Sequence, residues 1–146
     1  MEWKWGRMAE CTVDEVYEIL SVRQEVFVVE QKCFYQDCDG ADAKAFHLRG
    51  YQENKLVAYL RAFPAGVKFP EQSIGRVLTA PSHRGLGVGK VLMNEGLVRA
   101  EKEFGRAPIR IAAQAHLEKF YREFSFAPEG KVFMEDGIPH LEMLRP

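Results

Sequence analysis

The sequence predicts an α/β domain in which helices cover both faces of a mixed, twisted sheet of about seven strands. Two observations lead to this fold class. Short runs rich in β-branched and aromatic residues alternate with helical patterns along the whole chain. The length of 146 residues and the hydrophobic content of 47% suit one packed core, so we expect residues 1–146 to form a single domain.

The first third of the chain predicts a strand, a helix and a long loop. Residues 3–8 form the strand, and Thr12 and Glu15 have the spacing of a capping box, so the helix begins at Val13. Its apolar face carries it towards residue 30 through Val16, Ile19, Leu20, Val26 and Phe27. Residues 32–44 show neither the helical nor the strand periodicity of apolar residues, so we expect a loop there. Loops of about this length often shape binding sites.

The middle of the chain predicts a hairpin, a strand and a helix. Two β-rich runs, residues 45–51 and 56–63, are separated by a short polar stretch and form the hairpin. Residues 73–80 form the next strand, which Pro81 stops. The helix follows over residues 87–104, with Gly105 as its C-terminal cap, and we expect three residues to face inward: Val91, Leu92 and Val98.

The last third of the chain predicts a strand, a short helix and a closing hairpin. Residues 108–113 form the strand, and the apolar stripe Leu117, Phe120, Tyr121 and Phe124 indicates an amphipathic helix. Residues 131–134 and 141–144 form the hairpin across the Asp136-Gly137 turn and close the sheet.

Charge and composition exclude several classes of partner. The net charge is -1 and the pI is near 6.4, which gives no general attraction for nucleic acid or an anionic membrane. No apolar stretch is long enough to span a bilayer, and the first residues lack the apolar region of a signal peptide. We therefore expect a cytoplasmic protein without a nucleic-acid or membrane partner.

The cysteines predict neither a disulfide framework nor a metal site. Cys11, Cys33 and Cys38 are an odd set in a chain without an export signal. Cys33 and Cys38, with His47, lack the paired spacing and the fourth ligand of a structural zinc site. No basic partner that would activate either thiol is evident nearby in sequence, so we do not expect Cys33 or Cys38 to be a nucleophile.

The sharpest chemical signal is the run Arg84-Gly85-Leu86-Gly87-Val88-Gly89-Lys90 between a strand and a helix. A helix start carries unpaired N–H groups and partial positive charge, and glycines let a phosphate approach these donors. Arg84 and Lys90 add fixed charge at the two edges of the turn. The run therefore predicts a phosphate-binding turn.

Two common phosphate-binding patterns fit this run poorly. A triphosphate-binding loop would need Gly85 and Gly89 one residue further apart and a hydroxyl where Val91 stands. A dinucleotide-binding fold would need G-x-G-x-x-G at the first strand–helix junction, whereas G-x-G-x-G occurs here after several strands. A protein that binds a nucleotide or a dinucleotide therefore remains only the third-ranked interpretation.

Two motifs resemble the GNAT superfamily of N-acetyltransferases. Arg84-x-x-Gly87-x-Gly89 is similar to the pyrophosphate motif of that superfamily, and residues 120–126, FYREFSF, resemble its later F-Y-x-x-x-G-F segment with Ser125 in place of glycine. Over nearly the whole chain the sequence also resembles the ElaA-like subgroup. The similar segments are residues 23–31, 35–37, 39–42, 113–116 and 135–140.

The resemblance implies a set of residues that bind acetyl-CoA as co-substrate. The strand before the glycine turn would offer its backbone to the pantetheine arm, the turn would bind the pyrophosphate through its amides, and a side chain on the following strand would touch the cofactor. These residues are Val77, Leu78 and Thr79; Arg84, Gly85, Leu86, Gly87, Val88, Gly89 and Lys90; and Gln114.

The resemblance also implies the catalytic groups. Tyr121 stands where the family has the general acid that protonates the departing thiolate, although its place on an apolar stripe also suits a core residue. A base must take the proton of the amine, and the candidates are Glu30 and His140. Each residue could also lack a catalytic role, since Glu30 suits a solvated helix end and His140 suits an exposed turn.

These assignments lead us to expect an acetyltransferase. The chain transfers the acetyl group of acetyl-CoA directly to an amine, with no covalent enzyme intermediate and no metal. Gln31, Tyr35, Asp37 and Asp39 line the acceptor pocket, whose negative charge would favour a cationic acceptor. The alternative is a non-catalytic acyl-CoA sensor or interaction module. A homodimer is also possible, because exposed edge strands of such a sheet can pair between subunits.

Overall fold

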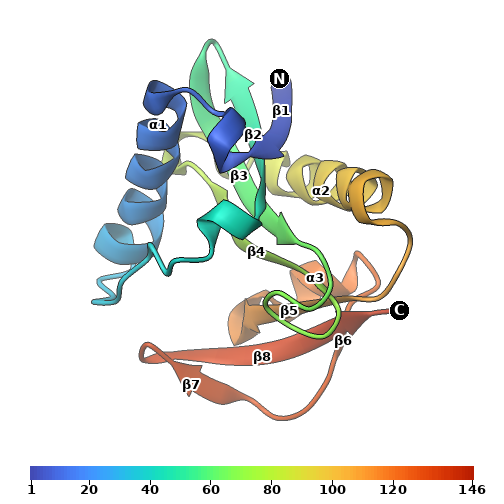
Figure 1. Cartoon of the computed structure of the whole chain (residues 1–146). Coiled ribbons are helices and arrows are strands. Elements are labelled where there is room, and N and C mark those ends of the chain that lie inside the picture. The colour runs from blue at the N-terminus through green and yellow to red at the C-terminus, as the bar shows by residue number, and fades with distance from the viewer.

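The computed structural model describes residues 1–146 and shows an α/β fold built on one open, mixed sheet of eight strands. The strand order is β1-β2-β3-β4-β5-β8-β6, and β7 pairs with β8 outside this path (Figure 1). The strands are β1 (Glu2–Arg7), β2 (Phe46–Gln52), β3 (Lys55–Phe63), β4 (Gln72–Thr79), β5 (Ile109–Gln114), β6 (Ala127–Pro128), β7 (Phe133–Glu135) and β8 (Ile138–Arg145). The predicted fold class is confirmed, and the two-residue β6 is the one strand that the sequence did not predict.

Three α-helices and a π-helical segment pack on this sheet. They are α1 (Val13–Arg23), the π-helix η2 (Gln24–Glu30) that continues it, α2 (Val88–Phe104) and α3 (Glu118–Arg122). The capping box at the start of α1 is confirmed, because Glu15 N donates to Thr12 Oγ1 at 3.1 Å and Thr12 N donates to Glu15 Oε1 at 2.8 Å. The short 3-10 turns are η1 (Met8–Glu10), η3 (Asp42–Lys44), η4 (Pro81–His83) and η5 (Ala115–Leu117).

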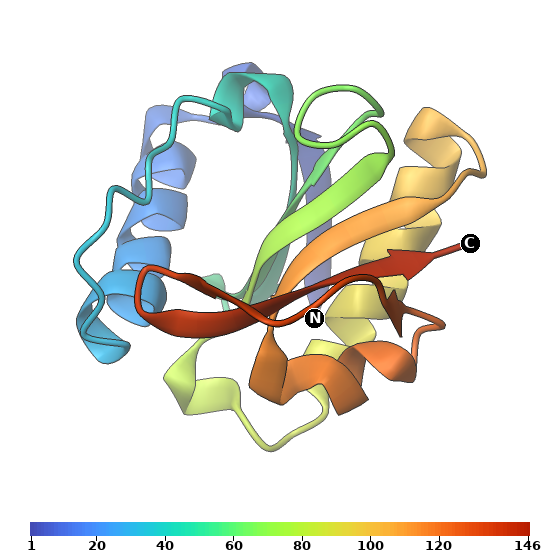
Figure 2. The ribbon, with the colours of Figure 1, turned by 90° about the horizontal axis from the view of Figure 1, so that it is seen from below.

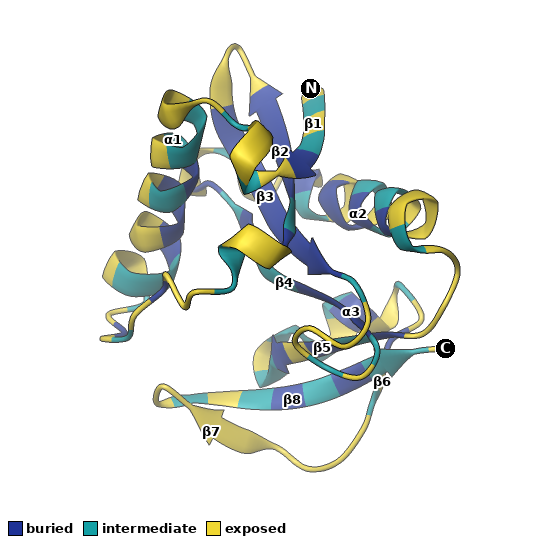
Figure 3. Ribbon diagram, in the orientation of Figure 1, coloured by how far each residue is buried: buried dark blue, intermediate teal, exposed yellow.

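Helices α1 and α2 lie on opposite faces of the sheet (Figure 2). Alternating side chains of β3 explain this arrangement, since successive residues of a strand point to opposite faces. Tyr59 joins the core beneath α1 with Ile19, and Leu60 joins the larger core beneath α2 with Leu92. Figure 3 shows the buried residues along the central strands and an exposed β7.

The buried face of α2 differs from the predicted one. Leu92 is buried as expected, but Val91 and Val98 are exposed, so that part of the prediction is wrong. The buried residues of this helix are Val88, Leu92, Met93, Gly96 and Ala100. Close approach to β3 selects this face, because a Cβ on Gly96 would lie 2.7 Å from Leu60 Cδ2. Small residues give no strong apolar signal, so the sequence pattern favoured the exposed valines.

Candidate active site

A cleft opens where β4 and β5 diverge. The two parallel strands pair only at Gln72↔Ile109 and Ser73↔Arg110. Beyond Ser73, β4 stays paired with β3 alone, so its other edge is free. The cleft beside this edge has a volume of about 940 Å³, which is within the range of small-molecule sites.

The free edge of β4 turns main-chain groups into the cleft. Ala80 N donates to Val57 O on β3 at 2.8 Å, and alternate residues of a strand bond to the same side. Leu78 therefore faces β3 with its backbone, whereas Val77 and Thr79 direct theirs towards the cleft. All three residues line the cleft.

The glycine turn presents unused main-chain donors at the start of α2. The six amides from Gly85 to Lys90 donate no hydrogen bond to the protein. Gly85 and Gly87 both have φ of 78°, a left-handed conformation that glycine adopts without strain. Free amides at a helix start are the donors that an anion requires, so the turn fits a diphosphate.

Only part of the turn lies in the lining of the cleft. Gly89 and Arg84 line it, and a Cβ on Gly89 would make ordinary contacts with Phe120 and Thr79. The remaining turn residues are not part of this lining. They are Gly85, Leu86, Gly87, Val88, whose side chain is in the core, and Lys90, whose Nζ pairs with Glu123 at 3.2 Å.

Arg84 and Glu30 bind each other. The two terminal nitrogens of Arg84 donate to Glu30 Oε2 and Oε1 at 2.8 and 2.7 Å, and Arg84 Nε donates to Thr79 O at 3.1 Å. The hydrogen bonds from Arg84 lower the pKa of Glu30. The structure thus joins a predicted phosphate ligand to one of the two predicted bases.

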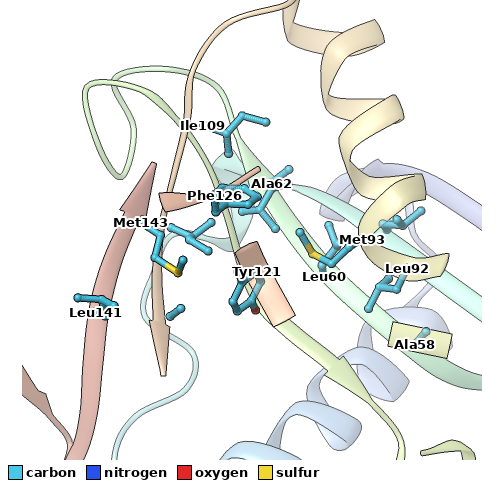
Figure 4. Packing of buried hydrophobic residues seen from close by; sticks show 14 of the residues in the cluster. Ala58, Leu60, Ala62, Leu92, Met93, Ile109, Tyr121, Phe126, Leu141 and Met143 are labelled. Atoms are coloured by element: carbon cyan, nitrogen blue, oxygen red, sulfur yellow. The ribbon is translucent and has the colours of Figure 1, made fainter. Parts of the chain in front are cut away.

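Tyr121 lies both in the core and in the lining of the cleft, so its position suits both interpretations of the sequence, a core residue and a catalytic one. The residue is 6% exposed and packs in the core, with its ring 6.0 Å from that of Phe126 (Figure 4). It also lines the cleft, and its hydroxyl has no partner in the protein yet is not sealed from solvent. Burial raises the pKa of Tyr121 to about 12, so the phenol is protonated at neutral pH.

His140 and Gln114 face each other across β5 and β8 in the lining of the cleft. His140 Nδ1 lies 2.7 Å from Ile138 O. Because a carbonyl only accepts, Nδ1 carries the hydrogen, and Nε2 of the neutral ring has a free lone pair. Glu135 Oε2 lies 3.6 Å from this nitrogen.

Asp37 does not line the cleft, contrary to expectation. It is 4% exposed and lies between two arginines, with Arg23 Nε and Arg76 Nε each 2.8 Å from its carboxylate. Both arginines also donate to its main-chain carbonyl at 3.1 Å. Asp37 therefore fastens the 32–44 loop to the sheet, whereas Gln31, Tyr35 and Asp39 do line the cleft.

The other aspartates of this loop are also paired with arginines. Arg61 binds Asp39 at 2.6 Å and Asp42 at 2.9 Å, and Arg23 binds Asp42 at 2.8 Å. Burial would raise the pKa of Asp39 and of Asp42, but hydrogen bonds and charge from the arginines, together with the Ala41 amide and Lys68 at Asp39, lower both values. The loop consequently presents no net negative charge to the cleft.

The sequence pattern did not predict the role of these arginines. Arg23 and Arg61 are buried, and Arg76 has φ of 51° at a bulge in β4. Charged residues within apolar runs were the available signal, since a buried arginine requires a partner. Ser125 is also left-handed, with φ of 70°, at the place where the related motif has glycine.

The diverging strands and the free amides at the start of α2 define a class of protein, the acyltransferases that take an acyl group from coenzyme A. The comparison with protein families agrees, because the family described as acetyltransferase (GNAT) domain matches residues 9–145. The chain belongs to this family.

Relatives of the ElaA type match the full chain. Protein ElaA of Escherichia coli is 40% identical over 147 residues, which cover 99% of this chain and 96% of that protein. Its crystal structure superposes with a TM-score of 0.93 at 39% identity and covers 99% of both chains. An acyl-CoA N-acyltransferase from Pseudomonas aeruginosa gives a TM-score of 0.94 at 39% identity, with 99% of each chain covered.

No group of three or more His, Cys, Asp or Glu side chains could hold a metal ion. His47 is buried with Nδ1 2.6 Å from Tyr59 Oη and Nε2 3.0 Å from Asp42 O. None of the helices combines the length and apolarity that crossing a bilayer requires.

Proposed function

We propose that the chain transfers the acetyl group of acetyl-CoA to a primary amine by direct attack, with residues 1–146 acting as one domain. One observation carries the proposal: six unused amides lie at the start of α2, beside the cleft that Tyr121 lines. Amides so arranged suit a diphosphate, and the diverging β4 and β5 leave an edge for the pantetheine arm.

Acetyl-CoA supplies an acyl group activated as a thioester. Amides of residues 85–90 hold its diphosphate, Val77 and Thr79 bind its pantetheine arm through the backbone, and Gln114 contacts it. Val77 N–H is suited to donate to the thioester oxygen as negative charge develops there. These main-chain donors are fixed by the fold and need no rearrangement during the reaction.

His140 is the proposed base and Tyr121 the proposed acid. His140 Nε2 accepts a proton from the amine, whose nitrogen bonds to the carbonyl carbon as the carbon–sulfur bond breaks. Tyr121 gives its proton to the thiolate, a transfer that a phenol protonated at neutral pH can make. Glu30 is the partner of Arg84 in this scheme, because a bidentate guanidinium and a lowered pKa make its carboxylate a poor proton acceptor.

The cysteines support direct transfer over a covalent enzyme intermediate. Cys33 lines the cleft, but its Sγ lies 3.2 Å from Asp136 O and contacts no base. Cys38 is exposed and outside the cleft. An effective thiol nucleophile normally has a basic or cationic partner that activates it.

Thermal unfolding with three ligands tests the proposal. Acetyl-CoA at about 100 times its Kd would stabilise the fold by about 2.7 kcal/mol, whereas ATP and NAD at equal concentration would not. Release of coenzyme A thiol with a panel of primary amines then reports transfer. An increase in Tm with ATP or NAD alone contradicts the assignment, and acetyl-CoA binding without transfer to any amine favours a non-catalytic sensor.

A further inference from the structure

The acceptor side of the cleft has opposite charges at its two ends. Glu135 and Asp136 line it at the β7–β8 turn. Lys68 lines it from the loop between β3 and β4, and Arg76 lines it from the bulge in β4, with Asp39 within 3.6 Å of both cations. Figure 2 shows these two parts of the chain apart, the turn beside the end of η2 and the β3–β4 loop near η3. The charges therefore act on different parts of a bound acceptor.

The positive end has donors that the protein does not use. Arg76 is 23% exposed in its side chain, and Asp37 engages its Nε and Nη2, while Nη1 donates to no group. Lys68 is 40% exposed in its side chain, and its Nζ has a single partner, Asp39, at 3.4 Å. A carboxylate can bind both donors at little cost, because neither must leave a tight ion pair.

The charge balance at this end is positive. The three aspartates of the loop, at positions 37, 39 and 42, pair with the three arginines at positions 23, 61 and 76. Lys68 adds one positive charge that no further carboxylate balances. An anionic group is therefore favoured here over a cationic one.

The negative end suits an ammonium. Glu135 Oε2 lies 3.6 Å from His140 Nε2, and Asp136 is its neighbour at the turn. An ammonium attracted to Glu135 arrives beside the nitrogen that is proposed to take its proton. Gly75 also lines the cleft, and a Cβ on it would meet open space.

We propose that the acceptor is a small amino acid, a primary amine that also carries a carboxylate. The amine lies towards His140 and Glu135, and the carboxylate binds Arg76 and Lys68, which makes the latter two the residues that determine acceptor specificity. The inference rests on the proposed transferase function and names the substrate class for the same site.

Matched pairs of acceptors test this inference. Linear ω-amino acids from glycine to aminohexanoate are each compared with the alkylamine of equal length, and acetyl-CoA-dependent thiol release gives kcat/KM. At the best length we expect kcat/KM about tenfold or more above that of the alkylamine. The length at which the preference is greatest measures the span between the two ends of the pocket.

Two lysine variants identify the source of the preference. Lys68→Met is expected to reduce the ratio between amino acid and alkylamine to about threefold or less. Lys55→Met removes the same charge from an exposed residue outside the cleft and is expected to keep the ratio. Equal kcat/KM for both kinds of acceptor, or an unchanged ratio in Lys68→Met, overturns the inference but leaves the transferase function intact. Absence of transfer to every amine overturns the transferase function and the inference with it.

Discussion

The carboxylate of Glu30 accepts hydrogen bonds from both terminal nitrogens of Arg84, at 2.8 and 2.7 Å, across a separation of 54 residues in sequence. Each side chain is about two-fifths exposed, and ion pairs of this kind contribute roughly 0–1 kcal/mol. A diphosphate at the start of α2 can therefore compete for Arg84. The pair connects the end of the π-helix η2 to the glycine turn, two segments that line the same cleft.

Replacing each of the two candidate bases by glutamine distinguishes their roles. Glu30→Gln is expected to leave kcat within about threefold, because the carboxylate bound to Arg84 takes no proton from the amine. His140→Gln is expected to lower kcat by about 100-fold or more, the usual contribution of a general base. Steady-state thiol release measures both variants. An equal loss in Glu30→Gln would identify Glu30 as a base in its own right.

Tyr121→Phe tests whether the phenol is the general acid. The hydroxyl has no partner in the protein, so we expect a nearly unchanged Tm and an acetyl-CoA Kd within about twofold. Loss of the general acid lowers kcat by about 100-fold or more. Tyr17→Phe, at an exposed tyrosine of α1, is the matched control and keeps full activity. Unimpaired turnover in Tyr121→Phe would mean that solvent protonates the thiolate.

Gly89→Ala tests whether the turn binds the diphosphate. The added methyl would lie 3.7 Å from Phe120 and 3.8 Å from Thr79 Oγ1, which is ordinary contact, and alanine favours a helix over glycine by about 1 kcal/mol. We therefore expect an equal or higher Tm with about tenfold weaker binding of acetyl-CoA. Acetyl-pantetheine lacks the diphosphate, so its affinity is expected to stay the same. A parallel loss for both ligands would exclude a diphosphate effect.

Asp37→Asn tests how strongly the arginine network holds the loop. The substitution removes one of the two carboxylates that bind the fully buried Arg23, and breaking a buried ion pair costs about 3–5 kcal/mol. Because Asp42 stays bound to Arg23, we expect a cost at the lower end of that range. Urea unfolding measures this loss of stability. Asp14→Asn makes the same change at an exposed residue in the first turn of α1 and is expected to cost about 1 kcal/mol or less. Similar costs for the two variants would show that the network adds little stability.

The same network makes stability depend on pH. Asp39 and Asp42 have lowered pKa values in the folded protein, so they bind protons more weakly there than in the unfolded chain. Their contribution is complete above the ordinary carboxyl pKa of about 4 and is lost as the pH falls through the folded values. We expect the free energy of unfolding to decrease steadily below about pH 4. Urea titrations of Asp42→Asn should show a shallower decrease, and an equal slope would assign the effect to other carboxylates.

The sequence by itself determined the parts of the protein that depend on local signals. The capping box fixed the start of α1, because Thr12 and Glu15 satisfy each other's main-chain donors within one turn. The glycine turn indicated a phosphate site for the same reason, since unpaired amides and absent Cβ atoms are properties of neighbouring residues. Seven of the eight strands were likewise visible as short β-rich runs.

Only the tertiary structure decided what depends on residues far apart in sequence. It paired Glu30 with Arg84, enclosed Asp37 between Arg23 and Arg76, and buried small residues of α2 in place of two valines. A charged side chain in the sequence does not reveal its partner, because the energy of an ion pair depends on distance and burial. The charge that the cleft offers to an acceptor is therefore a property of the fold.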